Sequence, residues 1–526
     1  MQRFYTFCIR FLQISSLVLF GILAVSSFFR TAYLENAYEI VIRLGWDNPL
    51  LNLLFLCCFL ALLTGIGKLF LRFEKGAGVL LVLSCLWIFG VSLLWTYFSK
   101  SGPASDCGSV YYAAKRFAVD DFSAISYRDS YFSVYPFQLG LAFFYEIIFR
   151  IVRSDNFHIL QGVNALCLVV CTVSQYFLCG RIFRKKDAQV YTLLLTDFCL
   201  PFIMYGSYIY GEIPSFAFLL FGTWMLLLTL EGQTKFSPAR KVLHGFLALL
   251  SLTCGVLVRK NSLVFMIALG IILVLWLLQN RHRLSSKRLA LCLVYFLLLF
   301  ALSFSVIPMV QNLYAKRSGQ RLNPGIPAST YLAMGLMETE AGPGHYSGYN
   351  FETFTEAADY DAETASEIGW NDYRRQLSYF AAHPGYGLQF FWKKFCIQWL
   401  NTGWSVFDST FVPFGERLPV IESCFSGPLY GVLKAYMTNY QMVLYLLCAI
   451  CSFVCFLDKK KDTVFLYLFP LTAFGGALLF LAWEASGRYV LPYAVFMLPC
   501  GGYGMCRLLD RTAPIFTVLR KGKKNV

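Results

Sequence analysis

Long apolar stretches recur along this chain of 526 residues, and they constrain its fold more than any other feature. A helix of about 18 or more apolar residues is long enough to cross a lipid bilayer. Thirteen stretches reach or approach that length: 11–29, 49–67, 77–98, 134–152, 159–183, 188–204, 215–230, 242–258, 262–279, 289–310, 441–457, 463–483 and 490–508. Hydrophobic residues make up 57% of the chain and charged residues only 14%. We therefore predict an all-α polytopic membrane protein.

The positions of Lys and Arg predict the topology, because basic residues are enriched in the cytoplasmic connections between membrane helices. Arg3 and Arg10 place the N-terminus in the cytoplasm. We interpret 11–29 as an uncleaved first span rather than a signal peptide, because twelve more apolar stretches follow. The next basic connectors contain Lys68, Arg72 and Lys75, and then Arg181, Arg184, Lys185 and Lys186. Both connectors are cytoplasmic only if one of the two stretches 134–152 and 159–183 does not cross the bilayer.

We expect the stretch 134–152 to lie at the interface or to insert only partly. It starts at Tyr135-Pro136, carries Glu146 and Arg150, and ends at Arg153, which suits a juxtamembrane helix better than a lipid-facing span. About twelve spans remain, with both termini cytoplasmic. Every later basic connector then lies inside: Lys235, Arg240 and Lys241; Arg281, Arg283, Lys287 and Arg288; Lys459, Lys460 and Lys461; and the tail Arg507, Arg511, Arg520, Lys521, Lys523 and Lys524.

The net charge of +15 is spread over these connectors, so it indicates orientation in a membrane and no nucleic-acid partner.

The chain divides into three parts. Residues 1–310 form an N-terminal transmembrane module with a first external loop at 99–157. Residues 311–436 form a small extracytoplasmic domain of mixed structure, and residues 437–526 form the C-terminal transmembrane helices with a basic cytoplasmic tail.

The extracytoplasmic segment 311–436 has its own composition. Tyr, Gly and His residues gather at 331–350, which favours a surface for a polar ligand, although the segment could instead only link two spans. One or two amphipathic helices are predicted at 351–382. The aromatic and basic stretch 389–400 suits a helix at the bilayer interface.

Several motifs with charged residues fall on the external side of this topology. They are Asp106 in a polar loop, Tyr135-Pro136-Phe137-Gln138, Glu212 in Tyr208-Ile209-Tyr210-Gly211-Glu212-Ile213-Pro214, Arg259-Lys260-Asn261, and Arg488 in Gly487-Arg488-Tyr489. In order and spacing they resemble the polytopic glycosyltransferases of the GT-C fold, particularly the bacterial family-39-like group of protein O-mannosyltransferases and aminoarabinose transferases. Many of these relatives carry two adjacent acids in the first loop, whereas this chain has Asp106-Cys107.

The resemblance implies a GT-C-like fold and transfer of a sugar from a polyprenyl-phosphate lipid to an external acceptor, which is a cell-envelope glycan, a glycolipid or a protein. It implies a plasma-membrane enzyme with its active site on the outer face. The resemblance does not decide whether the reaction requires a divalent cation, Mg²⁺ or Mn²⁺. The membrane lipids, the lipid-linked donor and the acceptor are the expected partners.

The residues themselves support roles of this kind. A carboxylate can take the proton of an acceptor hydroxyl, and Asp106 is the candidate base, with Glu212 as a second catalytic candidate. Arg259, Lys260 and Arg488 are candidates for binding the donor phosphate. Candidates for binding the acceptor or substrate are Tyr135, Gln138, His345 and Tyr349. Glu146 and Lys393 are weaker candidates.

Each candidate also has an ordinary structural explanation. Asp106 could be the N-cap of a helix at 107–118, and Glu212 could cap the next helix or interact with its dipole. Arg259 and Lys260 could extend from a span end to the interface, and Arg488 could pair with Glu484. The main alternative function is a transporter or flippase of lipid-linked saccharides, for which we would expect an internal repeat and charges near mid-membrane. A polymerase or ligase of envelope glycans and a non-enzymatic scaffold are further alternatives.

Overall fold

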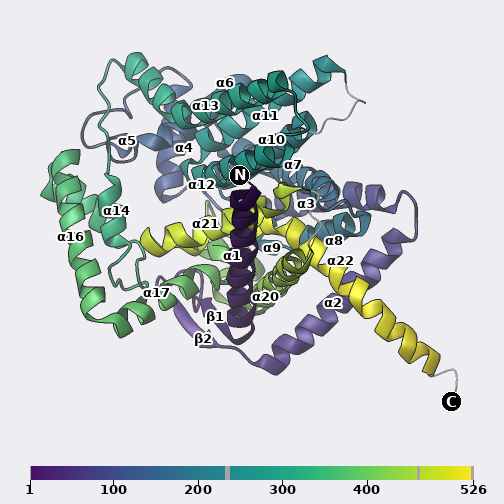
Figure 1. The fold of residues 1–526 in the computed structure, drawn as a ribbon. Helices are drawn as coiled ribbons and strands as arrows, with labels where there is room; N and C mark the ends of the chain where they lie inside the picture. Colours follow the sequence, from purple (N-terminus) through teal and green to yellow (C-terminus); the bar gives the residue numbers. More distant parts are fainter. Residues whose placement is uncertain (1, 231–236, 459–462, 523–526) are drawn as a thin grey trace.

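The computed structural model describes residues 2–230, 237–458 and 463–522, and Figure 1 shows a helical bundle. Lys235, Lys459, Lys460, Lys461, Lys523 and Lys524, which the topology prediction used, lie outside the described residues. Ten of the described helices are long and apolar enough to cross a membrane. A bend of 60° separates α8 (Lys186–Asp197) from the helical residues Leu200–Ser207. If these two segments form one broken span, the number of candidate spans rises to eleven. The predicted class of all-α polytopic membrane protein is confirmed.

The ten helices coincide with ten of the predicted apolar stretches. They are α1 (Gln2–Phe29), α2 (Pro49–Leu71), α3 (Gly76–Ser99), α7 (Phe157–Phe183), α10 (Glu212–Leu230), α11 (Pro238–Val258), α12 (Leu263–Asn280), α13 (Ser286–Ser318), α20 (Pro428–Leu457) and α21 (Leu468–Ala482). With the short turns that precede them, α12 and α21 belong to candidate spans of 21 and 19 residues, Lys260–Asn280 and Val464–Ala482. The bent pair of α8 and α9 (Leu200–Met204) covers the stretch 188–204. The last stretch lies within α22 (Leu491–Gly522), which contains Pro, several Gly and Arg507 and is not one of the ten.

The stretch 134–152 forms no span. It begins with the short helix α5 (Tyr131–Val134) and the turn Pro136–Gln138 and continues as α6 (Leu139–Val152), whose 14 residues are too few to cross a bilayer. Buried Glu146 on α6 pairs with Arg150 at 2.8 Å and with Arg317 of α13 at 2.7 Å. Glu146 therefore fastens α6 to α13.

Two of the basic connectors lie together at one end of the bundle. Lys186 donates to the carbonyl of Glu74 at 2.6 Å, and the ammonium of Lys185 lies 2.8 Å from a carboxylate oxygen of Asp510. Near the same end, Gln13 of α1 donates to the carbonyl of Cys455 at 3.0 Å. Segments that are distant in sequence thus meet here, as a chain that crosses the membrane repeatedly requires.

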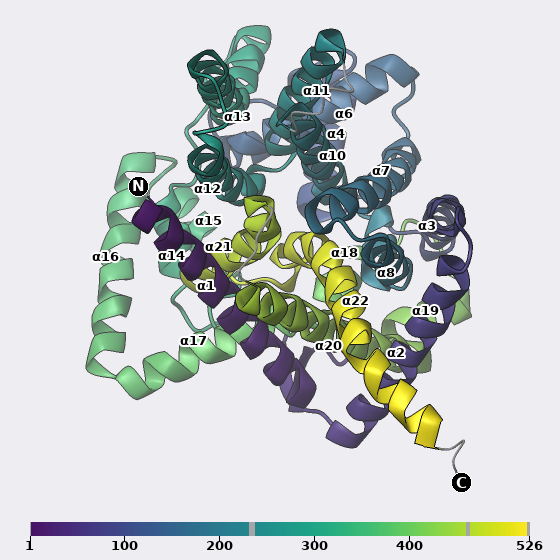
Figure 2. The ribbon, with the colours of Figure 1, turned by 45° about the vertical axis from the view of Figure 1, so that its right-hand side comes forward.

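The opposite end carries the long segment between α13 and α20. It contains α14 (Ala328–Met334), α15 (Tyr349–Glu352), α16 (Ala362–Ala382), α17 (Pro384–Trp399), α18 (Val406–Thr410) and α19 (Pro419–Ser426). In both views, α14, α16 and α17 lie on one flank of the bundle (Figures 1 and 2). The amphipathic helix expected at 351–382 is present as α16, with Asp361 as its N-cap.

The external segment differs from the mixed structure that we expected. Over the described residues the only sheet is a two-stranded hairpin of β1 (Arg30–Tyr33) and β2 (Arg43–Trp46), which lies between α1 and α2. The segment 311–436 is built of helices and loops instead. Its apolar residues recur at helical spacing rather than in the alternating pattern of a half-buried strand.

A buried lysine joins the external helices to the bundle. Lys394 of α17 is fully buried, and its ammonium donates to three backbone carbonyls, those of Gly335, Leu481 and Trp483. Gly335 follows α14, whereas Leu481 and Trp483 lie at the end of α21. All three ammonium protons have acceptors, so Lys394 holds this part of the external segment against α21.

Candidate functional site

A cavity of about 1000 Å³ lies beside the residues that follow α3, at the opposite end of that helix from Glu74 and its partner Lys186. One part of its lining is polar and includes Asp106, Gln138, Arg259, Lys260, Glu484 and Arg488. Another part is apolar and consists of Leu263, Val264, Ile267 and Ile271 of α12 together with Leu471 and Leu479 of α21. The cavity therefore joins a charged chamber to an apolar wall made by two membrane helices.

Most residues that the sequence singled out meet in this cavity. Seven of them line it: Asp106, Tyr135, Gln138, Arg259, Lys260, His345 and Arg488. Glu212 instead lines a small neighbouring pocket. Tyr349 lines neither pocket, because its hydroxyl donates to Asp372 of α16 at 2.6 Å and so attaches α15 to α16. Lys393 is exposed on α17, and it is the neighbouring Lys394 that is buried.

Asp106 lies in the first turn of α4 (Ser105–Phe117) and is only partly buried. It is not the N-cap of this helix, because that position is Ala104. Ser105 has a φ of 49°, which is unusual for a residue other than glycine and which marks a strained entry into the helix. The strained turn leaves the carboxylate of Asp106 at the cavity wall instead of engaging it in capping α4.

Tyr210 connects Asp106 to the loop before α6. Its hydroxyl donates to Oδ2 of Asp106 at 3.0 Å and accepts a hydrogen bond from the side-chain amide of Gln138 at 2.6 Å. The next residue, Gly211, has a φ of 89°, and a Cβ there would lie 3.0 Å from the carbonyl oxygen of Val258. This turn, which only glycine fits without strain, leaves Tyr210 in the large cavity and Glu212 in the small pocket.

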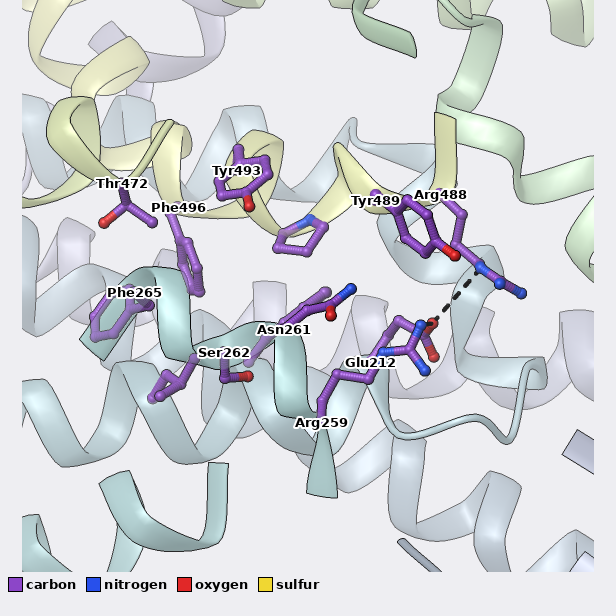
Figure 3. Close-up of a pocket in the computed structure, with 13 residues that line it drawn as sticks. Glu212, Arg259, Asn261, Ser262, Phe265, Thr472, Arg488, Tyr489, Tyr493 and Phe496 are labelled. Atoms are coloured by element: carbon purple, nitrogen blue, oxygen red, sulfur yellow. Dashed lines mark ion pairs between the residues drawn. The ribbon is translucent and has the colours of Figure 1, made fainter. Parts of the chain in front are cut away.

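Glu212 is the first residue of α10, where the helix dipole favours a carboxylate. Its Oε1 lies 2.8 Å from Nη2 of Arg259 and 3.9 Å from Nε of Arg488 (Figure 3). The side chain is 3% exposed. One buried carboxylate thus faces two arginines that are more than 200 positions apart in the sequence.

The small pocket beside Glu212 has a volume of about 30 Å³, enough for one or two water molecules. Nε of Arg488 is buried and has no hydrogen-bond partner among the described residues. Neither carboxylate oxygen of Glu212 has a hydrogen bond there beyond its ion pairs. A water in this pocket would connect these groups.

Aromatic rings hold the three cations at the cavity wall. The guanidinium of Arg259 lies 4.5 Å from the ring centre of Tyr210, and the ammonium of Lys260 lies 5.2 Å from that of Phe137. Arg488 donates to the hydroxyl of Tyr208 at 2.5 Å. Such contacts hold the cations while leaving N–H groups for an anion in the cavity.

Two further carboxylates line the cavity, and sequence reasoning did not select either of them. Glu484 accepts a hydrogen bond from Tyr489 at 3.0 Å, and no ion pair joins it to Arg488 within the described part of the chain. Burial raises the pKa of Glu484, while the bond from Tyr489 and the charge of Arg488 oppose the rise. Burial also raises the pKa of Asp408 to about 7, against the opposing effect of Arg488. Asp408 had no local signal in the sequence, whereas Glu484 shares a motif with Arg488.

The described residues contain no group of three or more His, Cys, Asp or Glu side chains that could hold a metal ion. The carboxylates of Asp106, Asp408 and Glu484 line the same cavity but are not gathered into such a group. These residues do not fit a divalent cation held by protein side chains alone, and we derive no step through one.

Comparison with known families finds one match for part of the chain. Residues 138–304 match the family model of the dolichyl-phosphate-mannose-protein mannosyltransferases. The matched stretch includes Gln138, Glu212, Arg259 and Lys260 but neither Asp106 nor Arg488. No curated protein sequence matches the chain. The chain is a multi-pass membrane protein that resembles the GT-C glycosyltransferases, and the family match supports a membrane glycosyltransferase of that type.

Proposed function

We propose that the protein transfers a sugar from a polyprenyl-phosphate-linked donor to an acceptor on the extracytoplasmic side of the cell membrane. The observation that carries this proposal is the two-part cavity. A lipid-linked sugar has a long apolar tail, an anionic phosphate and a polar ring. The apolar wall of α12 and α21, the cations Arg259, Lys260 and Arg488, and the uncharged polar residues of the same cavity match these three parts.

In the proposed reaction Asp106 takes the proton of the acceptor hydroxyl. The hydroxyl oxygen attacks the anomeric carbon, a new glycosidic bond forms, and the bond between that carbon and the phosphate oxygen breaks. The electron pair leaves with the polyprenyl phosphate, whose charge Arg259, Lys260 and Arg488 stabilise. No covalent intermediate with the protein is needed, because a neutralised phosphate is a competent leaving group.

In this reaction Glu212 is a positioning residue rather than the base. It lies in the small pocket behind the cations and pairs with Arg259, so an acceptor in the large cavity does not need to reach it. Its charge keeps two arginines close together that would otherwise repel each other. Tyr210 in turn orients the carboxylate of Asp106.

The proposed orientation follows from the two ends of the bundle. The end at which Lys185 and Lys186 lie would face the cytoplasm, and the cavity would open on the outer side. Both termini would then be cytoplasmic.

The test is transfer from radiolabelled polyprenyl-phosphate hexoses and pentoses in membranes that contain either the wild type or Asp106→Asn at matched amounts. We expect label in a new acceptor with the wild type and a loss of about 10²-fold to 10⁴-fold in the variant, the usual contribution of a general base. Asp121→Asn is the control, because Asp121 is an exposed acid of the same loop that does not line the cavity.

Equal transfer by the wild type and Asp106→Asn would remove the role of Asp106. Movement of intact donor across the bilayer without transfer, for any donor of the panel, would instead establish the transporter alternative.

A further inference from the structure

One wall of the cavity is used by neither the base nor the phosphate-binding cations. It consists of Tyr331 of α14, His345 and Asn350 of the loop that follows, and Trp483 and Glu484 after α21, all of which line the cavity. We call these five residues the external shelf. Figure 1 shows α14 beside the end of the bundle where α21 lies.

The shelf contains a pair of stacked aromatic rings. The rings of Tyr331 and Trp483 stack with their centres 5.0 Å apart and their planes within 9° of each other. Neither ring is fully buried. The two residues are more than 150 positions apart in the sequence, so the stacked pair exists only because the external segment docks on α21.

The shelf also carries polar atoms without partners. Asn350 is 1% exposed, and its amide nitrogen has no hydrogen-bond partner among the described residues, while its oxygen accepts from the N–H of Phe351 at 3.0 Å. Nδ1 of His345 is likewise buried without a partner in the described chain. A buried polar group left unpaired costs about 1–3 kcal/mol, and a ligand in the cavity that paired with these two groups would remove that cost.

The shelf is held rigidly, as a binding surface requires. The ammonium of Lys394 donates to the carbonyl of Trp483 at 2.6 Å and also to that of Gly335, close to Tyr331. The N–H of Ala485 donates to the carbonyl of Gly344 at 2.7 Å, directly before His345. These hydrogen bonds join the two sides of the shelf before any ligand binds, so a ligand would not lose binding free energy in ordering them.

This chemistry fits a sugar ring better than a peptide. The face of an aromatic ring carries partial negative charge and attracts the C–H groups of a pyranose, while an amide, an imidazole and a carboxylate pair with its hydroxyls. An extended peptide acceptor would be expected to form backbone hydrogen bonds with the edge of a β-strand. Neither β1 nor β2, the only strands of the described chain, lines the cavity.

We infer that the acceptor of the reaction is a saccharide, free or lipid-linked, and that the external shelf binds its ring. This inference rests on the proposed function and narrows it, because the protein acceptors of the matched family would not be the substrates of this chain. The bound ring would present a hydroxyl to the cavity that Asp106 also lines.

The first test is ligand-observed saturation-transfer NMR with the full-length protein in nanodiscs. The probes are methyl glycosides of gluco-, galacto- and manno-disaccharides and an octapeptide of Ala, Ser and Thr. We expect at least one disaccharide and not the peptide to bind, and Asn350→Ala and Trp483→Ala to weaken binding about threefold to tenfold, the worth of one hydrogen bond or a similar contact. Tyr386→Phe is the control, because Tyr386 is an exposed residue of α17 that does not line the cavity.

Binding of the peptide alone, or saccharide binding that neither shelf variant weakens, would overturn the inference. If Trp483→Ala does not fold, the saccharide binding of Asn350→Ala alone tests the inference.

The second test is product analysis after transfer from radiolabelled polyprenyl-phosphate sugars. Protease-resistant label in a glycan or glycolipid supports the inference. Protease-sensitive label overturns it and leaves the proposed function standing. Absence of transfer with every donor overturns the proposed function. It also overturns the inference that the acceptor is a saccharide, because that inference rests on the proposed function.

Discussion

Nη2 of Arg259 lies 2.8 Å from Oε1 of Glu212, and this ion pair joins the end of α11 to the start of α10 next to the cavity. Both side chains are largely buried, so each charge depends on the other for compensation. The pair sets the position of Arg259, one of the three cations assigned to the donor phosphate.

Replacing Glu212 by Gln should raise the donor KM about tenfold while kcat changes by less than about threefold, because the carboxylate orients the cations and does not move a proton. Steady-state kinetics with a labelled donor measure both constants. A fall in kcat of about 10²-fold at an unchanged KM would instead make Glu212 the base.

Replacing Arg488 by Lys should lower kcat/KM for the donor by about tenfold to a hundredfold. A lysine retains the charge but cannot form the planar, two-pronged contact with phosphate that a guanidinium offers. Arg375→Lys is the control, since Arg375 is an exposed residue of α16. Equal kcat/KM values for Arg488→Lys and the control would show that Arg488 does not bind the phosphate.

Replacing Lys394 by Met should destabilise the protein by about 2–3 kcal/mol, because one buried and two partly buried carbonyls lose their donor. Lys393→Met changes the neighbouring exposed lysine and should shift stability by less than about 0.5 kcal/mol. Thermal unfolding in detergent, followed by tryptophan fluorescence, compares the two variants. Equal melting temperatures would refute the role of Lys394 in joining α17 to α21.

The pKa of Asp408 predicts a pH dependence of stability. Burial raises this pKa from 3.8 to about 7, so the folded protein binds more protons than the unfolded chain between those values. The stabilisation is complete below about pH 4 and is lost as the pH rises through 7. Asp408→Asn should therefore gain stability relative to the wild type between pH 5 and pH 8.

One unit of pKa shift corresponds to about 1.4 kcal/mol, and the relative gain should be at least about that size. Melting temperatures measured across this pH range test the difference. Asp359→Asn is the control, because Asp359 is an exposed surface residue. A difference between wild type and Asp408→Asn that does not change with pH would contradict the raised pKa.

Much of the fold could be predicted from the sequence, because a bilayer imposes strict conditions on length and charge. Apolar stretches of sufficient length located ten spans and the bent pair, and the short α6 was correctly predicted not to cross. Charged residues near span ends are rare enough that Asp106, Arg259 and Arg488 stood out, and the structure places all three at one cavity.

Other features depend on contacts between distant segments and could not be predicted from local patterns. Lys393 and Lys394 are equivalent in sequence, yet only Lys394 points at the carbonyls of Gly335 and Trp483. Asp408 reaches the cavity through α18 and has no motif around it. The stacked pair of Tyr331 and Trp483 likewise forms only when the external segment docks on α21.

The most direct test of the central claim is photocrosslinking with a diazirine-bearing polyprenyl-phosphate sugar, followed by peptide mapping. If the donor occupies the cavity, label appears on α12 between Leu263 and Ile271 and on α21 between Leu471 and Leu479, and unlabelled donor competes it away. Arg488→Lys should reduce this label. Label confined to exposed faces of α2 and α13, unaffected by competitor, would contradict the account.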